Sequence, residues 1–187
     1  NIKSCNTHYL GPLILNYSLL IIPYLLGFFG IKKAQQGAYP LVTTAEIRSS
    51  HKEYQFDGES ILIPTVSSTG HGHASINRIH YQSGKFAVGS ILCALSPIDN
   101  NLVNTKFYYH YLSLFKDDLI VSKMKGSANV SLTIERLSSV IIPFISIKLQ
   151  KKFEEIFNSV QDIISNTDRT LELKKEFEKT KIEELII

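Results

Sequence analysis

The C-terminal segment, residues 148–187, carries an apolar repeat that constrains the fold more than any other stretch. Apolar residues recur there at alternating spacings of four and three, the heptad rule for a helix that buries one stripe against another helix. Glutamate and lysine flank the stripe as solvated side chains and ion-pair partners. The stripe consists of Phe153, Phe157, Val160, Ile164 and Leu171, with Thr167 at the repeat position between the last two, and its phase drifts after Leu171.

A helix of this length standing alone would leave its apolar stripe in water, so the pattern implies a partner helix. Two partners remain open: the segment folds back on its own domain, or it pairs with a helix of another chain. Another chain is favoured, because the sequence predicts no second long helix. The five stripe residues are therefore the predicted dimerisation residues.

Size and composition are those of an ordinary soluble globular chain. The 187 residues, 44% hydrophobic and 20% charged, allow one domain plus an appended helix and argue against disorder. A formal net charge of +3 permits a polyanionic partner without requiring one. Cys5 and Cys93 lie far apart, so neither a disulfide framework nor a four-cysteine metal site is predicted. A reducing cytoplasm fits best.

Residues 37–95 have the texture of a β domain. Clusters of Val, Ile, Tyr and Phe bounded by Gly, Pro, Asn and Ser are typical of short strands joined by turns. The predicted elements are strands at 40–42, 61–66, 79–82, 86–95 (one strand or two) and 140–143, a turn at Asp57-Gly58, and a helix at 105–115. Lys116, Asp117 and Asp118 are expected to end or cap that helix, and Pro143 is expected to end the last strand. The predicted fold class is α+β: a mixed, mostly β domain with packed helices, followed by a long C-terminal coiled-coil helix.

An apolar run at residues 13–31 leaves two alternatives open. Its length is that of a membrane span or uncleaved signal anchor, but Asn16, Pro23 and Gly27 interrupt it. The other alternative, which we favour, is a buried helix or a strand pair broken at Pro23. The rival function is therefore a membrane-anchored interaction protein with a coiled coil.

The sequence offers few combinations of residues that could form a catalytic site. The sequence has no phosphate-binding Gly-x-x-x-x-Gly-Lys loop, no Gly-x-Ser-x-Gly elbow and no methyltransferase Asn/Asp-Pro-Pro-Tyr/Phe motif. His71 and His73 form an i, i+2 pair without a nearby cysteine or carboxylate pair, which is far below a zinc signature. A small metal-dependent enzyme stays as a third hypothesis, and it predicts one equivalent of bound metal. No catalytic residue and no metal ligand is predicted.

Two small-polar loops and one basic patch hold the side chains that DNA recognition uses. Arg and Lys pair with guanine, Asn and Gln with adenine, and Lys, Ser, Thr and backbone amides contact phosphates. Residues 67–78 and 123–129 contain both kinds, and Arg48 with Lys52 forms a third patch. Each residue taken singly is better explained as a solvated surface side chain.

A series of short motifs, in this order and spacing, resembles the target-recognition domain of type I restriction-modification specificity subunits, and the segment after them resembles that family's helical spacer. The motifs are Gly37 with Tyr39-Pro40-Leu41-Val42-Thr43, Phe56-Asp57-Gly58-Glu59, Ile61-Leu62-Ile63-Pro64, Gly84-Lys85-Phe86-Ala87, Lys106-Phe107 with Tyr111-Leu112, Lys125-Gly126-Ser127-Ala128, Ile141-Ile142-Pro143 and Gln150-Lys151-Lys152-Phe153. The resemblance begins at about Leu26, where residues 26–33 resemble the family's opening strand. The residues before it match nothing expected of the family.

The resemblance implies sequence-specific DNA recognition by a non-catalytic subunit. Residues 1–147, with 1–25 unassigned, would be the target-recognition domain that reads one half of a bipartite site. Residues 148–187 would be the spacer helix for dimerisation and methyltransferase docking. The implied DNA-binding residues are Arg48, Lys52, Ser67, Ser68, Thr69, His71, His73, Asn77, Arg78, Lys123, Lys125, Ser127 and Asn129.

Members of this family usually carry two recognition domains and two spacer helices, and this chain has one of each. The resemblance therefore implies a half-length subunit or fragment that forms a homodimer, or the recognition tail of a fused adenine methyltransferase. The implied partners are double-stranded DNA, an adenine methyltransferase subunit and a restriction subunit, with no membrane. No cofactor is expected here, since S-adenosylmethionine would bind the methyltransferase. The expected location is the cytoplasm.

Overall fold

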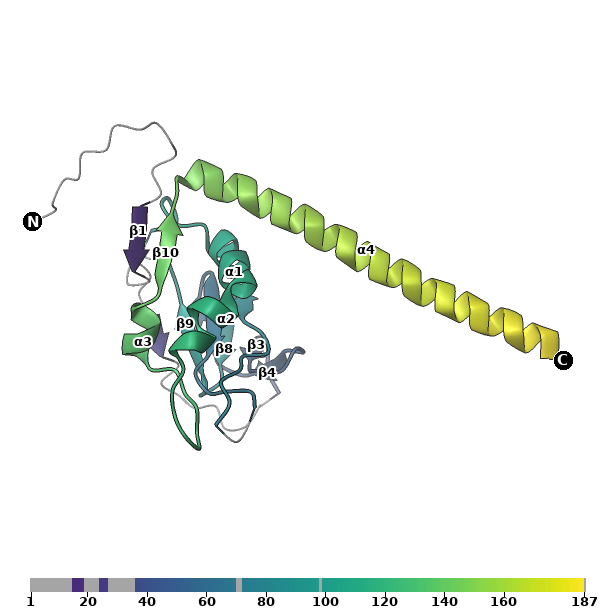
Figure 1. The fold of residues 1–187 in the computed structure, drawn as a ribbon, viewed down its shortest axis with the longest axis horizontal. Helices are drawn as coiled ribbons and strands as arrows, with labels where there is room; N and C mark the ends of the chain where they lie inside the picture. The colour runs from purple at the N-terminus through teal and green to yellow at the C-terminus, as the bar shows by residue number, and fades with distance from the viewer. Residues whose placement is uncertain (1–14, 19–23, 27–35, 70–71, 98, 187) are drawn as a thin grey trace, which may run out of the picture.

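The computed structural model describes residues 15–18, 24–26, 36–69, 72–97 and 99–186, which form a mixed domain and one long projecting helix (Figure 1). The strands are β1 Leu15–Ser18, β2 Tyr24–Leu26, β3 Tyr39–Val42, β4 Ser49–His51, β5 Phe56–Asp57, β6 Ser60–Pro64, β7 His80–Gln82, β8 Lys85–Val88, β9 Leu92–Leu95 and β10 Ile141–Phe144. The helices are α1 Thr105–Leu114, α2 Lys116–Leu119, the 3₁₀ turn η2 Val121–Lys123, α3 Ile134–Ser138 and α4 Ile147–Ile186. The predicted α+β class is confirmed.

Two four-stranded sheets form the centre of the domain, in the orders β2-β9-β6-β7 and β4-β3-β8-β5, and β1 pairs separately with β10. Only β3 and β8 run parallel among the described pairs. The predicted 86–95 segment proves to be two strands, β8 and β9, in different sheets. The chain turns between them at Gly89, whose N–H donates to the Val42 carbonyl at 2.8 Å.

The sheet containing β6 and β9 lies between α1 and the other sheet, which explains why every residue of β6 is buried. Because successive strand residues face opposite sides, Ile61 and Ile63 join the core cluster under α1. Leu62 points the other way, into a second cluster with Phe86 and Val88.

The predicted helix at 105–115 is confirmed as α1, whose first turn is capped by Asn104 accepting from the Phe107 N–H at 2.8 Å. Two boundary predictions were wrong. Residues 116–118 do not end helical structure but form α2 after a break at Phe115. Strand β10 continues past Pro143, which lies opposite Asn16; β10 pairs only with β1 in the described sheets, and proline is tolerated on such an edge strand.

The described parts of the apolar run at 13–31 are the short strands β1 and β2, which pair with β10 and β9. Pro23 and the expected opening strand beyond Leu26 lie outside the described residues. In the described portion of the chain, no helix is long and apolar enough to cross a membrane.

Helix α4 packs on α1 over its first turns and then projects from the domain (Figure 1). Ring centroids of Phe153 and Phe107 are 6.0 Å apart, and those of Phe157 and His110 are 5.1 Å apart. From residue 159 to residue 181 every side chain is exposed. The alternative that this segment folds back on its own domain therefore holds only for its first three turns.

Candidate nucleic-acid interface

The first predicted loop, residues 67–78, is braced by the hydroxyl of Ser67. Ser67 Oγ donates to the His73 carbonyl at 2.6 Å and accepts from the Ser75 N–H at 3.0 Å. The Ser68 N–H donates to the Ser75 carbonyl at 2.9 Å. The two described limbs of the loop are therefore held against each other, and Ser67 serves as an internal brace.

The second predicted loop, residues 123–129, lies directly against the first. The Ser67 N–H donates to the Val130 carbonyl at 3.0 Å, and a Cβ added to Gly72 would lie 2.6 Å from the Ser127 carbonyl oxygen. The second loop is closed by two reciprocal hydrogen bonds of 3.0 Å between Lys125 and Ser131. Two segments about fifty positions apart thus form one surface.

Most predicted DNA-binding residues of these loops face solvent. The exposed ones are Ser68, Thr69, His73, Asn77, Lys125, Ser127 and Asn129, while Ser67, Arg78 and Lys123 are half-buried. His71 lies outside the described residues. Hydroxyl, amide, imidazole and ammonium groups on one exposed surface suit contacts with both phosphates and base edges.

Gly72→Ala is expected to weaken binding to DNA about tenfold, or about 1.4 kcal/mol. Gly72 has φ +79°, and its backbone approaches Ser127 too closely for a side chain, so alanine would push the two loops apart. The matched control is Gly84→Ala, since Gly84 has φ +76° but open space around it. Fluorescence anisotropy with a labelled duplex measures both variants, and equal affinities would contradict a shared loop surface.

The third predicted patch divides. Arg48 lines one cavity with Arg78, whereas Lys52 follows the opposite end of β4 and has its backbone N beside Gly37. Arg48 Nε donates to Gln82 Oε1 at 3.1 Å, and an Arg48 terminal nitrogen donates to the Tyr81 carbonyl at 3.3 Å. The Arg48 guanidinium is therefore fixed to β7.

His80 completes this fixation. Its Nδ1 lies 3.1 Å from a terminal nitrogen of Arg48, and because a guanidinium only donates, Nδ1 is the acceptor and the imidazole is neutral. Burial, followed by the charges of Arg48 and Arg78, lowers the pKa of His80 from 6.5 to about 4. Burial also lowers the pKa of Arg48, with Tyr109 opposing this and Arg78 adding to it.

Sequence reasoning missed Glu46, His80, Gln82 and Tyr109, which line this cluster or brace it. For two of these residues the sequence did hold a signal, a polar side chain at every second position. Arg78, His80 and Gln82 alternate along the chain, so a strand there places all three on one face. Tyr109 gave no comparable signal, because it comes from α1.

The metal hypothesis finds no support in the described parts of the chain. Among the residues the structure describes, no group of three His, Cys, Asp or Glu side chains is placed to hold a metal ion. His73 is exposed on the first loop, and its carbonyl is taken up by Ser67.

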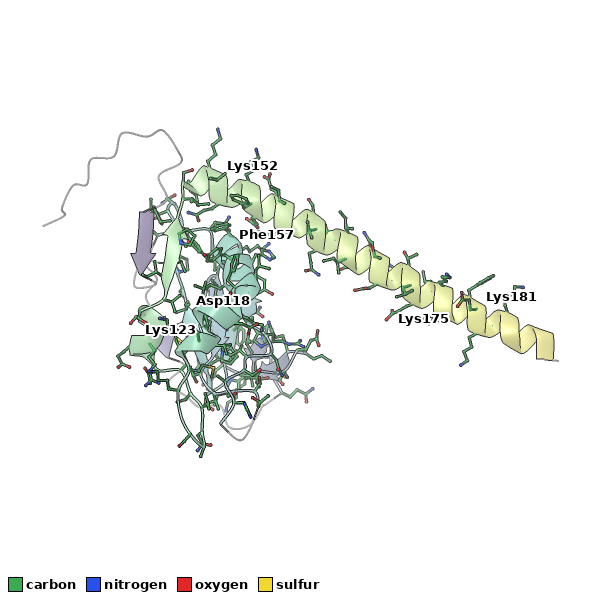
Figure 2. The ribbon with its side chains drawn as sticks, viewed as in Figure 1. Asp118, Lys123, Lys152, Phe157, Lys175 and Lys181 are labelled. Carbon is green, nitrogen blue, oxygen red and sulfur yellow. The ribbon has the colours of Figure 1, made fainter. Side chains whose placement is uncertain are left out.

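The predicted dimerisation stripe also divides. Phe153 and Phe157 contact α1, whereas Val160, Ile164 and Leu171 are 48%, 48% and 50% exposed on the projecting part of α4. Figure 2 shows Lys175 and Lys181 far out along that part, well beyond Phe157.

Comparisons with known proteins agree on this architecture. A model of the family described as type I restriction modification DNA specificity domain matches residues 28–183. A search of curated proteins found no match. The S subunit of the type I restriction-modification system from M. genitalium is similar at 16% identity and TM-score 0.64, over 86% of this chain and 42% of that one.

The HsdS subunit from Thermoanaerobacter tengcongensis is similar at 16% identity and TM-score 0.62, over 87% of this chain and 41% of that one. A chain from a structure of the type I restriction-modification system is similar at 16% identity and TM-score 0.60, over 87% of this chain and 42% of that one. This chain thus spans under half the length of these structural relatives, which share its fold. The match over residues 28–183 shows that the chain belongs to the family of type I restriction modification DNA specificity domains.

Proposed function

We propose that this chain is a non-catalytic DNA-recognition unit of a type I restriction-modification system, which reads one half of a bipartite target. The observation that carries the proposal is the joining of loops 67–78 and 123–129 into one exposed polar surface, on a domain of the specificity family. Exposed Asn77 and Asn129 suit adenine edges, while Lys125 and the loop hydroxyls suit phosphates. Residues 1–147 form the recognition domain in this proposal, with 1–25 unassigned.

The projecting part of α4 is the proposed assembly element, within a spacer of residues 148–187. Its exposed apolar stripe supports pairing with the same helix of a second copy, which would place two recognition domains in one symmetric particle.

Catalysis belongs to the partners in this proposal. The chain directs an adenine methyltransferase subunit, which holds S-adenosylmethionine, and a restriction subunit to the recognised DNA in the cytoplasm. Methyltransferase docking is assigned to the helical segment 148–187.

Retention of a random-sequence duplex pool across a salt series tests this function. The chain is incubated with the pool, with and without a candidate methyltransferase subunit, and the retained DNA is sequenced. One enriched short motif, or two copies of it at a fixed spacing, is the expected result. If DNA is retained at low salt but no sequence is enriched at any salt concentration, sequence recognition is contradicted. Such binding would be contact with phosphates alone, which holds all sequences alike and weakens as salt rises.

A further inference from the structure

A polar cavity of about 480 Å³ opens where the end of the first loop meets β4 and β7. It draws its walls from three separate parts of the chain, and none of them lies among the undescribed residues. The lining residues that matter here are Glu46, Arg48, Asn77, Arg78, His80 and Tyr109.

This cavity carries a surplus of positive charge. It contains two guanidiniums, those of Arg48 and Arg78, against the single carboxylate of Glu46. His80 adds no charge, because its Nδ1 accepts from Arg48. The two arginines are close enough to repel each other, and binding an anion between them would relieve that repulsion.

The two arginines are held differently. Arg48 is anchored through Gln82, His80 and the Tyr81 carbonyl, so it presents a fixed charge. Among the residues that the structure describes, Arg78 has a single ion pair, in which a terminal nitrogen lies 2.9 Å from Glu46 Oε2. The side chain of Glu46 is 77% exposed and that of Arg78 is 40% exposed. Ion pairs this exposed contribute little, so a stronger anion can displace Glu46.

We propose that this cavity binds one phosphodiester group of the DNA backbone, and that Glu46 occupies the position of that group in the free chain. The inference rests on the proposed function. A guanidinium pairs with a phosphate through two parallel hydrogen bonds, which a single exposed carboxylate contact does not match. A phosphate is favoured over a base edge, because a neutral base would leave the surplus charge uncompensated.

Each binding event then breaks the contact between Arg78 and Glu46. Glu46 is an internal competitor that lowers affinity for every DNA sequence alike. Asn77, exposed at the same cavity and adjacent to Arg78, is thereby brought next to the bound backbone.

Glu46→Gln tests this inference in the full 187-residue chain. Affinity for a random-sequence duplex at about 50 mM salt is expected to rise about fivefold, and to fall more steeply with added salt than in the unchanged protein. The matched control is Glu53→Gln, which removes the same charge from an exposed residue outside the cavity and is expected to change affinity less than about twofold. In an Arg78→Ala background, Glu46→Gln is expected to change affinity no more than Glu53→Gln does. Thermal unfolding of all variants verifies that they are folded.

The following results would overturn the inference. Equal gains in DNA affinity from Glu46→Gln and Glu53→Gln would show that the effect comes from overall charge and not from this cavity. A gain that persists without Arg78, or that alters which motif is enriched, would exclude a backbone contact at this cavity. Saturable binding of inorganic phosphate, together with DNA affinity that Glu46→Gln leaves unchanged, would indicate a small-anion site. Absence of duplex binding by every variant would instead contradict the proposed function itself, and this inference with it.

Discussion

Ile164→Asp is expected to abolish the proposed dimerisation through α4, raising the dissociation constant at least about 1000-fold. Ile164 lies on the exposed stripe with Val160 and Leu171, which no residue of the described domain covers. Truncating one buried isoleucine typically costs about 2 to 5 kcal/mol, and a symmetric pair loses two, while each aspartate must also be desolvated. Analytical ultracentrifugation over a concentration series measures the change.

Ser165→Asp is the matched control, since it adds the same charge one residue on and about 100° around the helix, on its polar side. Phe157 is a poorer choice, because it also contacts α1 through His110. An unaltered dimer in Ile164→Asp would show that the chains associate elsewhere. A wild-type chain that stays monomeric at all concentrations would contradict the proposed homodimer but not the proposed DNA-recognition surface.

Gln150→Leu is expected to lower the free energy of unfolding by about 3 kcal/mol. Gln150 is fully buried at the start of α4. Its Nε2 donates to the Leu102 carbonyl at 2.9 Å and to the Ile145 carbonyl at 2.7 Å, and its Oε1 accepts from the Asn104 N–H at 2.7 Å. Leucine keeps the volume but removes the partner of three part-buried backbone groups, each loss costing about 1 kcal/mol.

Urea unfolding followed by circular dichroism measures this loss. Gln161→Leu makes the same change at an exposed position of α4 and is expected to alter the free energy of unfolding by less than about 0.5 kcal/mol. Similar values for the two variants would show that the polar contacts at the base of α4 contribute little. Gln150 also joins α4 to the segment before α1 and to the residue after β10, so its loss removes one of the contacts that set the direction of the helix.

The two polar loops, residues 67–78 and 123–129, show where sequence reasoning succeeds and where it stops. Their composition identified both loops as polar surface segments, and the structure exposes most of the named residues. Composition did not reveal that the Ser67 hydroxyl bonds to the His73 carbonyl and the Ser75 N–H. A serine that faces inward and one that faces solvent look alike in a sequence. Nor did it show that Gly72 touches Ser127, a contact between segments far apart along the chain.

Local periodicity and turn residues determined the elements themselves: the β-rich centre, α1 and the forty-residue α4 follow from spacings of two, 3.6 and 3.5 along the chain. The tertiary structure alone decided what those elements bring together. Arg48 pairs with His80 across 32 positions, Arg78 meets Glu46, and the stripe of α4 divides between α1 and solvent. The spacing of residues shows only which of them share one face of a helix or strand. A site depends on which of those faces pack against each other in the folded chain.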